Sequence, residues 1–149
     1  AALDRAGIDP SRHRPILDAV DATGRYGFSD RYAGPAEGVA ACLHDADVLD
    51  AMGAIGIARA FTYGATIGEP IWEPGHDLAG TYTSGRTSSV VAHFYEKLLR
   101  LHGELRTAAG RELGAPRHAF LVEFLRRFHD EFGDAEPPEL SRAGTPAAR

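Results

Sequence analysis

The most informative stretch of this sequence is HDADVLDAMGAIGIAR, residues 44–59. Between Asp50 and Arg59 it contains only apolar residues and glycine. A helix that is apolar around most of its circumference is normally buried. Carboxylates in such a helix need a cation, hydrogen-bond donors or a metal ion, because an unpaired buried charge is costly. The stretch therefore predicts a buried helix whose acidic residues serve either a buried ion pair, such as Asp50 with Arg59, or a metal or catalytic site.

The aspartates of this stretch do not all lie on one helix face. At about 100° per residue, Asp47 and Asp50 lie about 60° apart, whereas Asp45 lies about 160° from Asp47. Asp45 is therefore not expected to share a site with Asp47, and its substitution is expected to matter far less. His44 lies about 60° from Asp47, on the side away from Asp50. His44 is therefore not expected to serve readily as a further metal ligand beside Asp47.

A second group of polar residues occurs in HFYEKLL, residues 93–99. His93, Glu96 and Lys97 have the i, i+3 and i+4 spacing that places side chains on one helix face. Lys97 is the only lysine among 16 lysine and arginine residues, and a compact ammonium group is suited to binding phosphate. On spacing alone, a solvated helix face with a weak interaction between Glu96 and Lys97 is the more common arrangement.

Working outward, the rest of the sequence predicts helices and almost no strand. The expected helices in the first half are a turn ending at Gly7, a helix from Asp9-Pro10 to Gly24, and a long run over 36–65 that Gly53 and Gly56 bend or divide. A further helix is expected to be capped by Thr87 or Ser88 and to extend to Leu105. The last expected helix is capped by Thr107, and Pro116 kinks or restarts it. Residues 26–34 and 68–86 are expected to form loops, and 134–149 a disordered tail. We therefore expect one all-α domain over residues 1–133.

Composition excludes several classes of protein. A length of 149 residues suits a single domain, and no run of about 18 apolar residues is present to span a membrane. The net charge of −5 argues against binding to a nucleic-acid polymer. No secretory signal is visible, and the single Cys42 fits a reducing compartment. We therefore expect a cytoplasmic protein.

Four stretches resemble one known family. The block HDADVLDAMGAIGIARAFTYG, residues 44–64, closely resembles a block of bacterial HD-domain phosphohydrolases of the YedJ-like branch. The stretches PIWEP (70–74), TSSVVAHFYEKLLRL (87–101) and RHAFLVEFLRRF (117–128) resemble later parts of that family, in the same order. The resemblance covers residues 1 to about 133, and it implies an HD-domain-like helical bundle.

The resemblance implies a metal site to which this chain contributes one ligand. In that superfamily the metal is bound by a first His, an adjacent His-Asp pair and a distant Asp, and the distant Asp matches Asp47. The dipeptide His44-Asp45 looks like the pair, but it occupies the position immediately before the distant Asp. The other ligands are therefore expected upstream, and the chain is expected to be an HD bundle truncated at its N-terminus, with little activity alone.

The implied function is a metal-dependent phosphohydrolase that uses a divalent ion such as Mn²⁺ or Mg²⁺. Its expected substrates are small phosphate esters or anhydrides, with nucleotides as the expected class. Asp47 is assigned as the metal ligand and, with His93 and Lys97, as a catalytic residue. Arg59, His93 and Lys97 are assigned to phosphate contacts. Asp50 is expected to support the metal ligands or to hold Arg59.

Other roles and alternatives follow from matched positions. Glu96 is expected to orient Lys97. Tyr26 stands where the family usually has His, and Glu69 where it often has Arg, which indicates an altered substrate or lost activity. The alternative to an enzyme is a non-catalytic helical binding domain that keeps the HD fold without an active metal site. A homo-oligomer is compatible with either.

Overall fold

The computed structural model describes residues 2–21, 23–28, 38–75, 78 and 87–133. Its elements in chain order are α1 (Ala2–Arg5), η1 (Pro10–Arg12), α2 (His13–Asp21), α3 (Gly38–Asp50), α4 (Gly53–Ile67), α5 (Val90–His93), η2 (Phe94–Leu98), η3 (Arg100–Glu104) and α6 (Ala108–Phe132). This part of the chain contains no β-strand, which confirms the all-α prediction. The predicted tail over 134–149 and most of both predicted loops lie outside the described residues.

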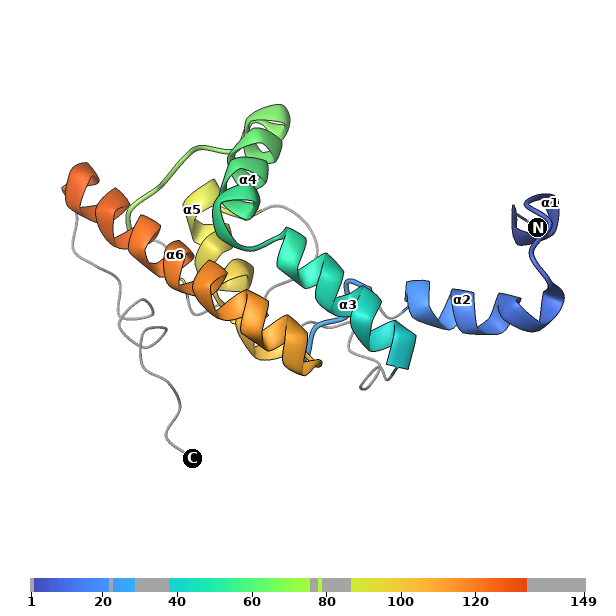
Figure 1. Cartoon of the computed structure of the whole chain (residues 1–149). Coiled ribbons are helices and arrows are strands. Elements are labelled where there is room, and N and C mark those ends of the chain that lie inside the picture. The colour runs from blue at the N-terminus through green and yellow to red at the C-terminus, as the bar shows by residue number, and fades with distance from the viewer. Residues whose placement is uncertain (1, 22, 29–37, 76–77, 79–86, 134–149) are drawn as a thin grey trace.

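The helices form a bundle with one extension (Figure 1). The long helix α6 packs against α3 and α4, and α4 also contacts α5. α2 extends from the bundle beside α3, and α1 lies at the far end of α2. None of the helices in the described ranges combines the length and the apolar character needed to cross a membrane.

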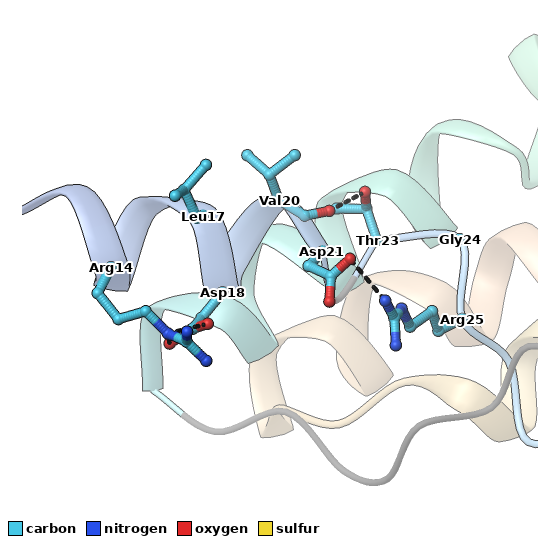
Figure 2. Close-up of a pocket in the computed structure, with 8 residues that line it drawn as sticks. All are labelled: Arg14, Leu17, Asp18, Val20, Asp21, Thr23, Gly24 and Arg25. Atoms are coloured by element: carbon cyan, nitrogen blue, oxygen red, sulfur yellow. Dashed lines mark hydrogen bonds and ion pairs between the residues drawn. The ribbon is translucent and has the colours of Figure 1, made fainter. Parts of the chain in front are cut away.

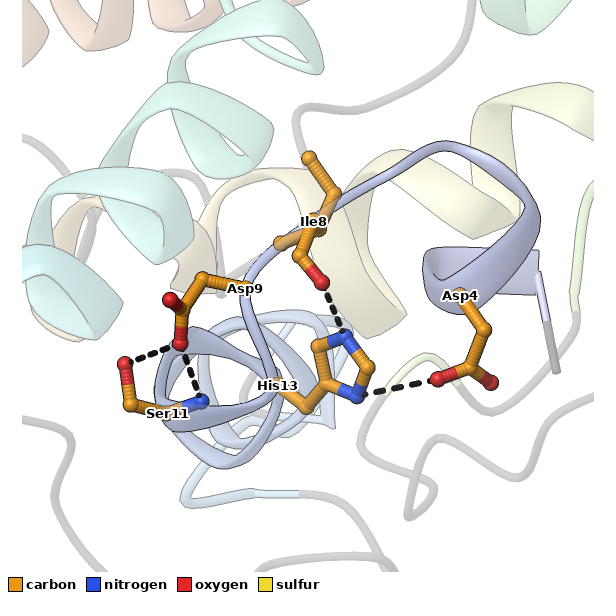
Figure 3. A network of polar contacts seen from close by, with 5 residues as sticks. All are labelled: Asp4, Ile8, Asp9, Ser11 and His13. Carbon is orange, nitrogen blue, oxygen red and sulfur yellow. Dashed lines mark hydrogen bonds and ion pairs between the residues drawn. The ribbon is translucent and has the colours of Figure 1, made fainter.

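The turn before α2 is fixed by local hydrogen bonds (Figure 3). The Asp9 carboxylate accepts hydrogen bonds from the backbone N–H and the hydroxyl of Ser11, at 2.8 and 2.6 Å. His13 Nε2 donates to the carbonyl of Ile8 at 2.8 Å. The predicted cap at Asp9 is confirmed, although the helix ends at Asp21, before the predicted end at Gly24.

The long run predicted over 36–65 is divided into α3 and α4. Gly53 begins α4 in the left-handed conformation, at a φ of 69°, which only glycine adopts readily. A Cβ atom at Gly53 would also lie 3.1 Å from Cγ of Arg117. The predicted burial is only partly confirmed: Met52 is buried, whereas Ile55 is 63% exposed.

The single α-helix predicted from residue 87 to 105 is wrong. Ser89, rather than Thr87 or Ser88, caps α5, since its Oγ accepts from the backbone N–H of Ala92 at 3.1 Å. The chain then forms the π-helical turn η2 and the 3₁₀ segment η3. The apolar spacing indicated burial correctly, because all five periodic residues are buried: Val91, Phe94, Leu98, Leu101 and Leu105. Periodicity reports which side chains are buried and not which hydrogen bonds the backbone makes.

Helix α6 begins where the sequence predicted and continues past its proline. The Thr107 hydroxyl accepts a hydrogen bond from the backbone N–H of Gly110 at 2.9 Å, which confirms the predicted cap. Pro116 neither ends nor restarts the helix.

Aromatic rings fill the space between α4, η2 and α6. Phe61, Phe94 and Phe124 form a triangle with ring centroids 5.8 to 5.9 Å apart, a spacing typical of attractive ring pairs. This cluster fixes the position of η2 against the two long helices.

Side-chain contacts attach the segment after α4 to the bundle, in addition to backbone hydrogen bonds from the first two residues of α5. The Glu69 carboxylate accepts hydrogen bonds from the backbone N–H and the hydroxyl of Thr87, at 3.2 and 3.4 Å. The edge of Trp72 packs on His129, which is buried and hydrogen-bonded to the Tyr95 hydroxyl at 2.7 Å. His129 is therefore structural, as expected for a histidine outside the main motifs.

Candidate functional site

Asp47 lies on the exposed side of α3 beside Tyr26. Its Oδ2 accepts a hydrogen bond from the Tyr26 hydroxyl at 3.3 Å. Tyr26 itself is only 5% exposed, and its ring stacks on Phe28 with the ring centroids 5.3 Å apart. The Asp47 carboxylate, which the sequence assigned as a metal ligand, is therefore accessible and lies beside the buried Tyr26 ring and the Phe28 ring stacked on it.

Lys97 reaches the same tyrosine from the π-helical turn η2. Its Nζ lies 5.1 Å from the centroid of the Tyr26 ring, within the range of a cation–π interaction. Burial lowers the Lys97 pKa from its ordinary value, the negative charge of Asp47 raises it, and the positive charge of Arg59 lowers it further. The charges of Asp47 and of Arg59 therefore both act on the Lys97 ammonium.

Arg59 approaches the site from α4 and forms an ion pair with Asp50. Its Nη1 also donates to the backbone carbonyl of Asp50 at 3.3 Å. The pair proposed from the sequence therefore exists, but it is not buried, because the two side chains are 59% and 60% exposed. An exposed pair of this kind contributes little to stability. Because its side chain is exposed, Arg59 also remains accessible to a ligand.

His93 lies half-buried at the end of α5, one turn before Lys97. Burial, with a further contribution from the Lys97 charge, lowers the His93 pKa to about 4. The imidazole is therefore neutral at neutral pH and can donate or accept a hydrogen bond without carrying charge. Glu96 lies half-buried on η2, and its predicted orientation of Lys97 stays a prediction.

The structure thus joins the two sequence motifs, because Asp47 of the first and Lys97 of the second meet at Tyr26. Asp47 comes from α3, Arg59 from α4 and Lys97 from η2, and Asp47 and Lys97 both contact Tyr26. A π-helical turn is rare and is frequently found at functional sites. The Lys97 ammonium and the accessible Arg59 guanidinium are the groups here that suit a phosphorylated ligand.

His44 and Asp45 are structural, although the His44 ring lies 6.0 Å from the Tyr26 ring, centroid to centroid. Both are buried, and His44 Nε2 donates to the carbonyl of Glu104 at 3.2 Å. The Asp45 carboxylate accepts hydrogen bonds from the backbone N–H groups of Arg106 and Thr107. Burial raises the Asp45 pKa, but the hydrogen bonds from Thr107 and Arg106 outweigh it, so the pKa lies below its ordinary value. These hydrogen bonds indicate that Asp45 stabilises the fold, while its smaller importance for metal-dependent turnover stays a prediction.

The described residues do not by themselves fit a complete metal site. Within the described ranges, no group of three or more His, Cys, Asp or Glu side chains is placed to hold a metal ion. Asp47 accepts a hydrogen bond from a phenol, and its charge acts on the Lys97 ammonium; neither group is a ligand that hard divalent ions prefer. Asp47 as a metal ligand therefore stays a prediction.

Sequence reasoning missed the part that the Tyr26–Phe28 segment plays. The backbone N–H of Gly27 donates to Glu104 Oε2 at 2.8 Å, and the Arg100 guanidinium lies 4.2 Å from the centroid of the Phe28 ring. The signal in the sequence was a pair of aromatic residues around a glycine, which is visible but does not indicate what the rings contact.

A separate hollow along α2 does not coincide with this site (Figure 2). It is lined by residues between 14 and 25. Its four charged side chains form two ion pairs, Arg14 with Asp18 and Arg25 with Asp21. None of the residues assigned from the sequence lines this hollow.

Comparison with known proteins supports an HD-like superfamily. No protein-family model matches the chain. The chain is 40% identical over 89 residues to the uncharacterized protein YpgQ of Bacillus subtilis (strain 168), which covers 60% of this chain and 38% of YpgQ. Its structure is also similar to that of Bacillus subtilis YpgQ in complex with ADP, with a TM-score of 0.62 and 29% identity over 87% of this chain and 60% of that chain.

A second solved structure carries the superfamily name. An HD-superfamily hydrolase from Bacillus thuringiensis matches with a TM-score of 0.61 and 26% identity, over 89% of this chain and 60% of that chain. The chain therefore has the helical fold of HD-superfamily proteins, and the likeness supports a hydrolase at the family level. It spans between 38% and 60% of the length of these relatives.

Proposed function

We propose that this chain carries the phosphate-binding part of an HD-type phosphohydrolase of the YedJ-like branch. Its substrates would be small phosphate esters or anhydrides, with nucleotides as the class. The observation that carries the proposal is that Asp47 and Lys97 both contact Tyr26, while the charge of Arg59 acts on the Lys97 ammonium. The likeness to an HD-superfamily hydrolase and to YpgQ, whose structure was solved with ADP, supports it.

The two cations have complementary roles in this proposal. The Lys97 ammonium is largely withdrawn from solvent, where its interaction with a phosphate oxygen is stronger than in water. Arg59 is paired with the exposed carboxylate of Asp50, which a phosphate can displace. The planar guanidinium of Arg59 can then bind two phosphate oxygens at once. His93, neutral at neutral pH, would donate or accept a hydrogen bond at the phosphate rather than neutralise its charge.

A divalent ion such as Mn²⁺ or Mg²⁺ is part of the proposal for the whole enzyme only. Asp47 is the residue of this chain that we assign to it. The described residues do not complete a group of three metal ligands around Asp47. The role proposed for this chain is therefore phosphate binding and includes no metal-dependent step. The same proposal includes a cytoplasmic location and no binding to nucleic-acid polymers or membranes. It is also compatible with a homo-oligomer.

The second candidate function is a non-catalytic domain that binds a phosphorylated ligand. The observation in its favour is that Asp47 interacts with the Tyr26 phenol and the Lys97 ammonium, neither of which is a metal ligand. Such a domain would keep affinity for nucleotides and show no turnover. The two candidates therefore share a binding prediction and differ in the activity assay.

The test is calorimetric titration of the 149-residue chain with ADP, followed by nucleotide hydrolysis assays with Mn²⁺ and with Mg²⁺. Lys97→Met and Arg59→Gln are each expected to weaken ADP binding by about 10-fold or more, the usual value of a hydrogen bond to a charged group. Arg127→Gln is the matched control, because Arg127 is an exposed α6 residue paired with Glu123. Equal affinity in Lys97→Met and Arg127→Gln would overturn the proposal, and binding without turnover would favour the second candidate.

A further inference from the structure

Tyr26 contacts the two charged groups at the centre of the candidate site through different parts of its side chain. Its hydroxyl donates to Oδ2 of Asp47 at 3.3 Å. Its ring lies beneath the ammonium of Lys97, 5.1 Å from Nζ to the centroid. One side chain therefore fixes a carboxylate from α3 and an ammonium from η2 relative to each other.

Tyr26 is itself held in place by independent contacts. Its ring is nearly parallel to Phe28, with an interplanar angle of 12°, and the Arg100 guanidinium covers the Phe28 ring. The backbone between the two rings is attached to η3 by the hydrogen bond from Gly27 to Glu104. A Cβ atom at Gly27 would lie 3.1 Å from Glu104 Oε1, so the close approach favours glycine. The tyrosine is thus anchored independently of the two residues that it positions.

Fixing these side chains before a ligand arrives has a direct effect on affinity. Lysine loses substantial rotamer entropy when it is held in one conformation, and a ligand that must order a flexible side chain binds less tightly. We infer that Tyr26 is a positioning residue that preorganises Lys97 for a phosphate group and fixes the Asp47 carboxylate beside it. The inference rests on the proposed function, because it assumes that these two residues serve a phosphorylated ligand.

The position of Lys97 can be measured without any activity, because Lys97 is the only lysine in the chain. Incorporation of ¹³C-labelled lysine gives a single ε-methylene signal in the NMR spectrum. A methylene group beside the face of an aromatic ring is shifted upfield by the ring current and shows a nuclear Overhauser effect to the ring protons. We expect both in the unmodified chain, and this measurement does not depend on whether any variant folds.

Two substitutions separate the contributions of the ring and the hydroxyl. Tyr26→Phe keeps the ring and is expected to keep the upfield shift of Lys97. Tyr26→Leu removes the ring and is expected to move the signal to the position of an exposed lysine. Tyr63→Leu is the matched control, since Tyr63 is 65% exposed on α4, and it should leave the Lys97 signal unchanged.

Titration with inorganic phosphate, followed on the same signal, tests the consequence for binding. We expect Tyr26→Phe to weaken the affinity about 3-fold and Tyr26→Leu about 10-fold, in line with the modest strength of one hydrogen bond and one cation–π contact. The Tyr63→Leu control is expected to bind phosphate like the unmodified chain.

The outcomes distinguish this inference from the proposed function. Absence of the upfield shift and of the Overhauser effect in the unmodified chain would overturn the positioning role. An intact shift in the unmodified chain, with phosphate affinity equal in Tyr26→Leu and Tyr63→Leu, would overturn the preorganisation. If phosphate leaves the Lys97 signal of the unmodified chain unchanged, the proposed function fails at this site, while the ring-current result still decides whether Tyr26 positions Lys97.

Discussion

Asp45 and Thr107 are joined by two hydrogen bonds, from the backbone N–H of Thr107 at 2.8 Å and from its hydroxyl at 2.6 Å. The same carboxylate accepts a third hydrogen bond, from the backbone N–H of Arg106 at 2.8 Å. It therefore lies at the start of α6, where backbone N–H groups lack partners within the helix and the helix dipole favours negative charge. Asp45 fastens α3 to α6, although 62 residues separate it from Thr107.

The first prediction compares two aspartates of α3. Asp45→Ala is expected to lower the free energy of unfolding by about 2–4 kcal/mol, because it leaves several backbone and side-chain donors near the core without an acceptor. Asp50→Ala is expected to cost less than about 1 kcal/mol, because its pair with Arg59 is exposed. Urea denaturation followed by circular dichroism measures both. Equal losses would contradict the structural role of Asp45.

The second prediction compares Gly110, which lies against the Asp45 carboxylate, with Gly103, which has open space around it. A Cβ atom at Gly110 would lie 2.1 Å from Asp45 Oδ2, whereas a Cβ atom at Gly103 would meet nothing within 4 Å. Gly110→Ala is therefore expected to destabilise the fold by more than about 2 kcal/mol through displacement of the carboxylate. Gly103→Ala should change the stability by less than about 1 kcal/mol. A similar shift of the thermal midpoint in both variants would mean that the Asp45 contact is easily rearranged.

The third prediction concerns pH. The pKa of His93 is about 4 in the folded chain, against an ordinary value of 6.5. Between these values the unfolded chain binds more protons, so the free energy of unfolding is expected to rise with pH and level off above 6.5. The contribution of His93 is at most about 3 kcal/mol.

His93→Gln is expected to flatten this rise between the folded and the ordinary pKa of the imidazole, about 4 and 6.5. The slope should shrink without vanishing, because burial and the neighbouring His118 also lower the pKa of His102. Urea denaturation at half-unit steps of pH gives the slopes. An identical slope in the unmodified chain and in His93→Gln would show that the folded chain does not exclude a proton from His93.

The fourth prediction concerns Asp47. Its side chain is exposed and makes a long hydrogen bond to Tyr26, so Asp47→Ala is expected to change the stability by less than about 1 kcal/mol. Any Mn²⁺- or Mg²⁺-dependent nucleotide hydrolysis is expected to be lost in the same variant. The hydrolysis assay and the circular dichroism spectrum are compared with those of Ala46→Ser, a neighbouring exposed position on α3. Undiminished hydrolysis in Asp47→Ala would remove Asp47 from the site.

The sequence predicted those features that depend on short-range chemistry. The caps at Asp9 and Thr107 were predictable because a capping side chain bonds to a backbone group two or three residues away. Asp47, Arg59 and Lys97 were assigned from matched motifs, and the structure shows that Asp47 and Lys97 contact the same tyrosine, Tyr26. Their roles in metal binding and catalysis remain predictions.

The features that the sequence did not predict depend on contacts between distant segments. The π-helical turn begins at Phe94, which packs against Phe61 and Phe124 from other helices, and no local pattern encodes these contacts. The role of Tyr26 depends on two partners from different helices. For Asp45, helical rotation correctly separated it from Asp47 but could not show that the start of α6 lies on its other side.

The hydrogen bond from the Leu99 N–H to the Phe94 carbonyl, at 2.9 Å, spans five residues instead of four, so η2 accommodates one residue more than an α-helical turn would. Deletion of a single residue there would allow a regular helix, but it would turn everything beyond it by about 100° relative to α5. Lys97 would then leave the ring of Tyr26, or the buried Leu98 and Leu101 would leave the core. The segment between His93 and Leu101 is consequently intolerant of changes in length, even where it tolerates changes of side chain.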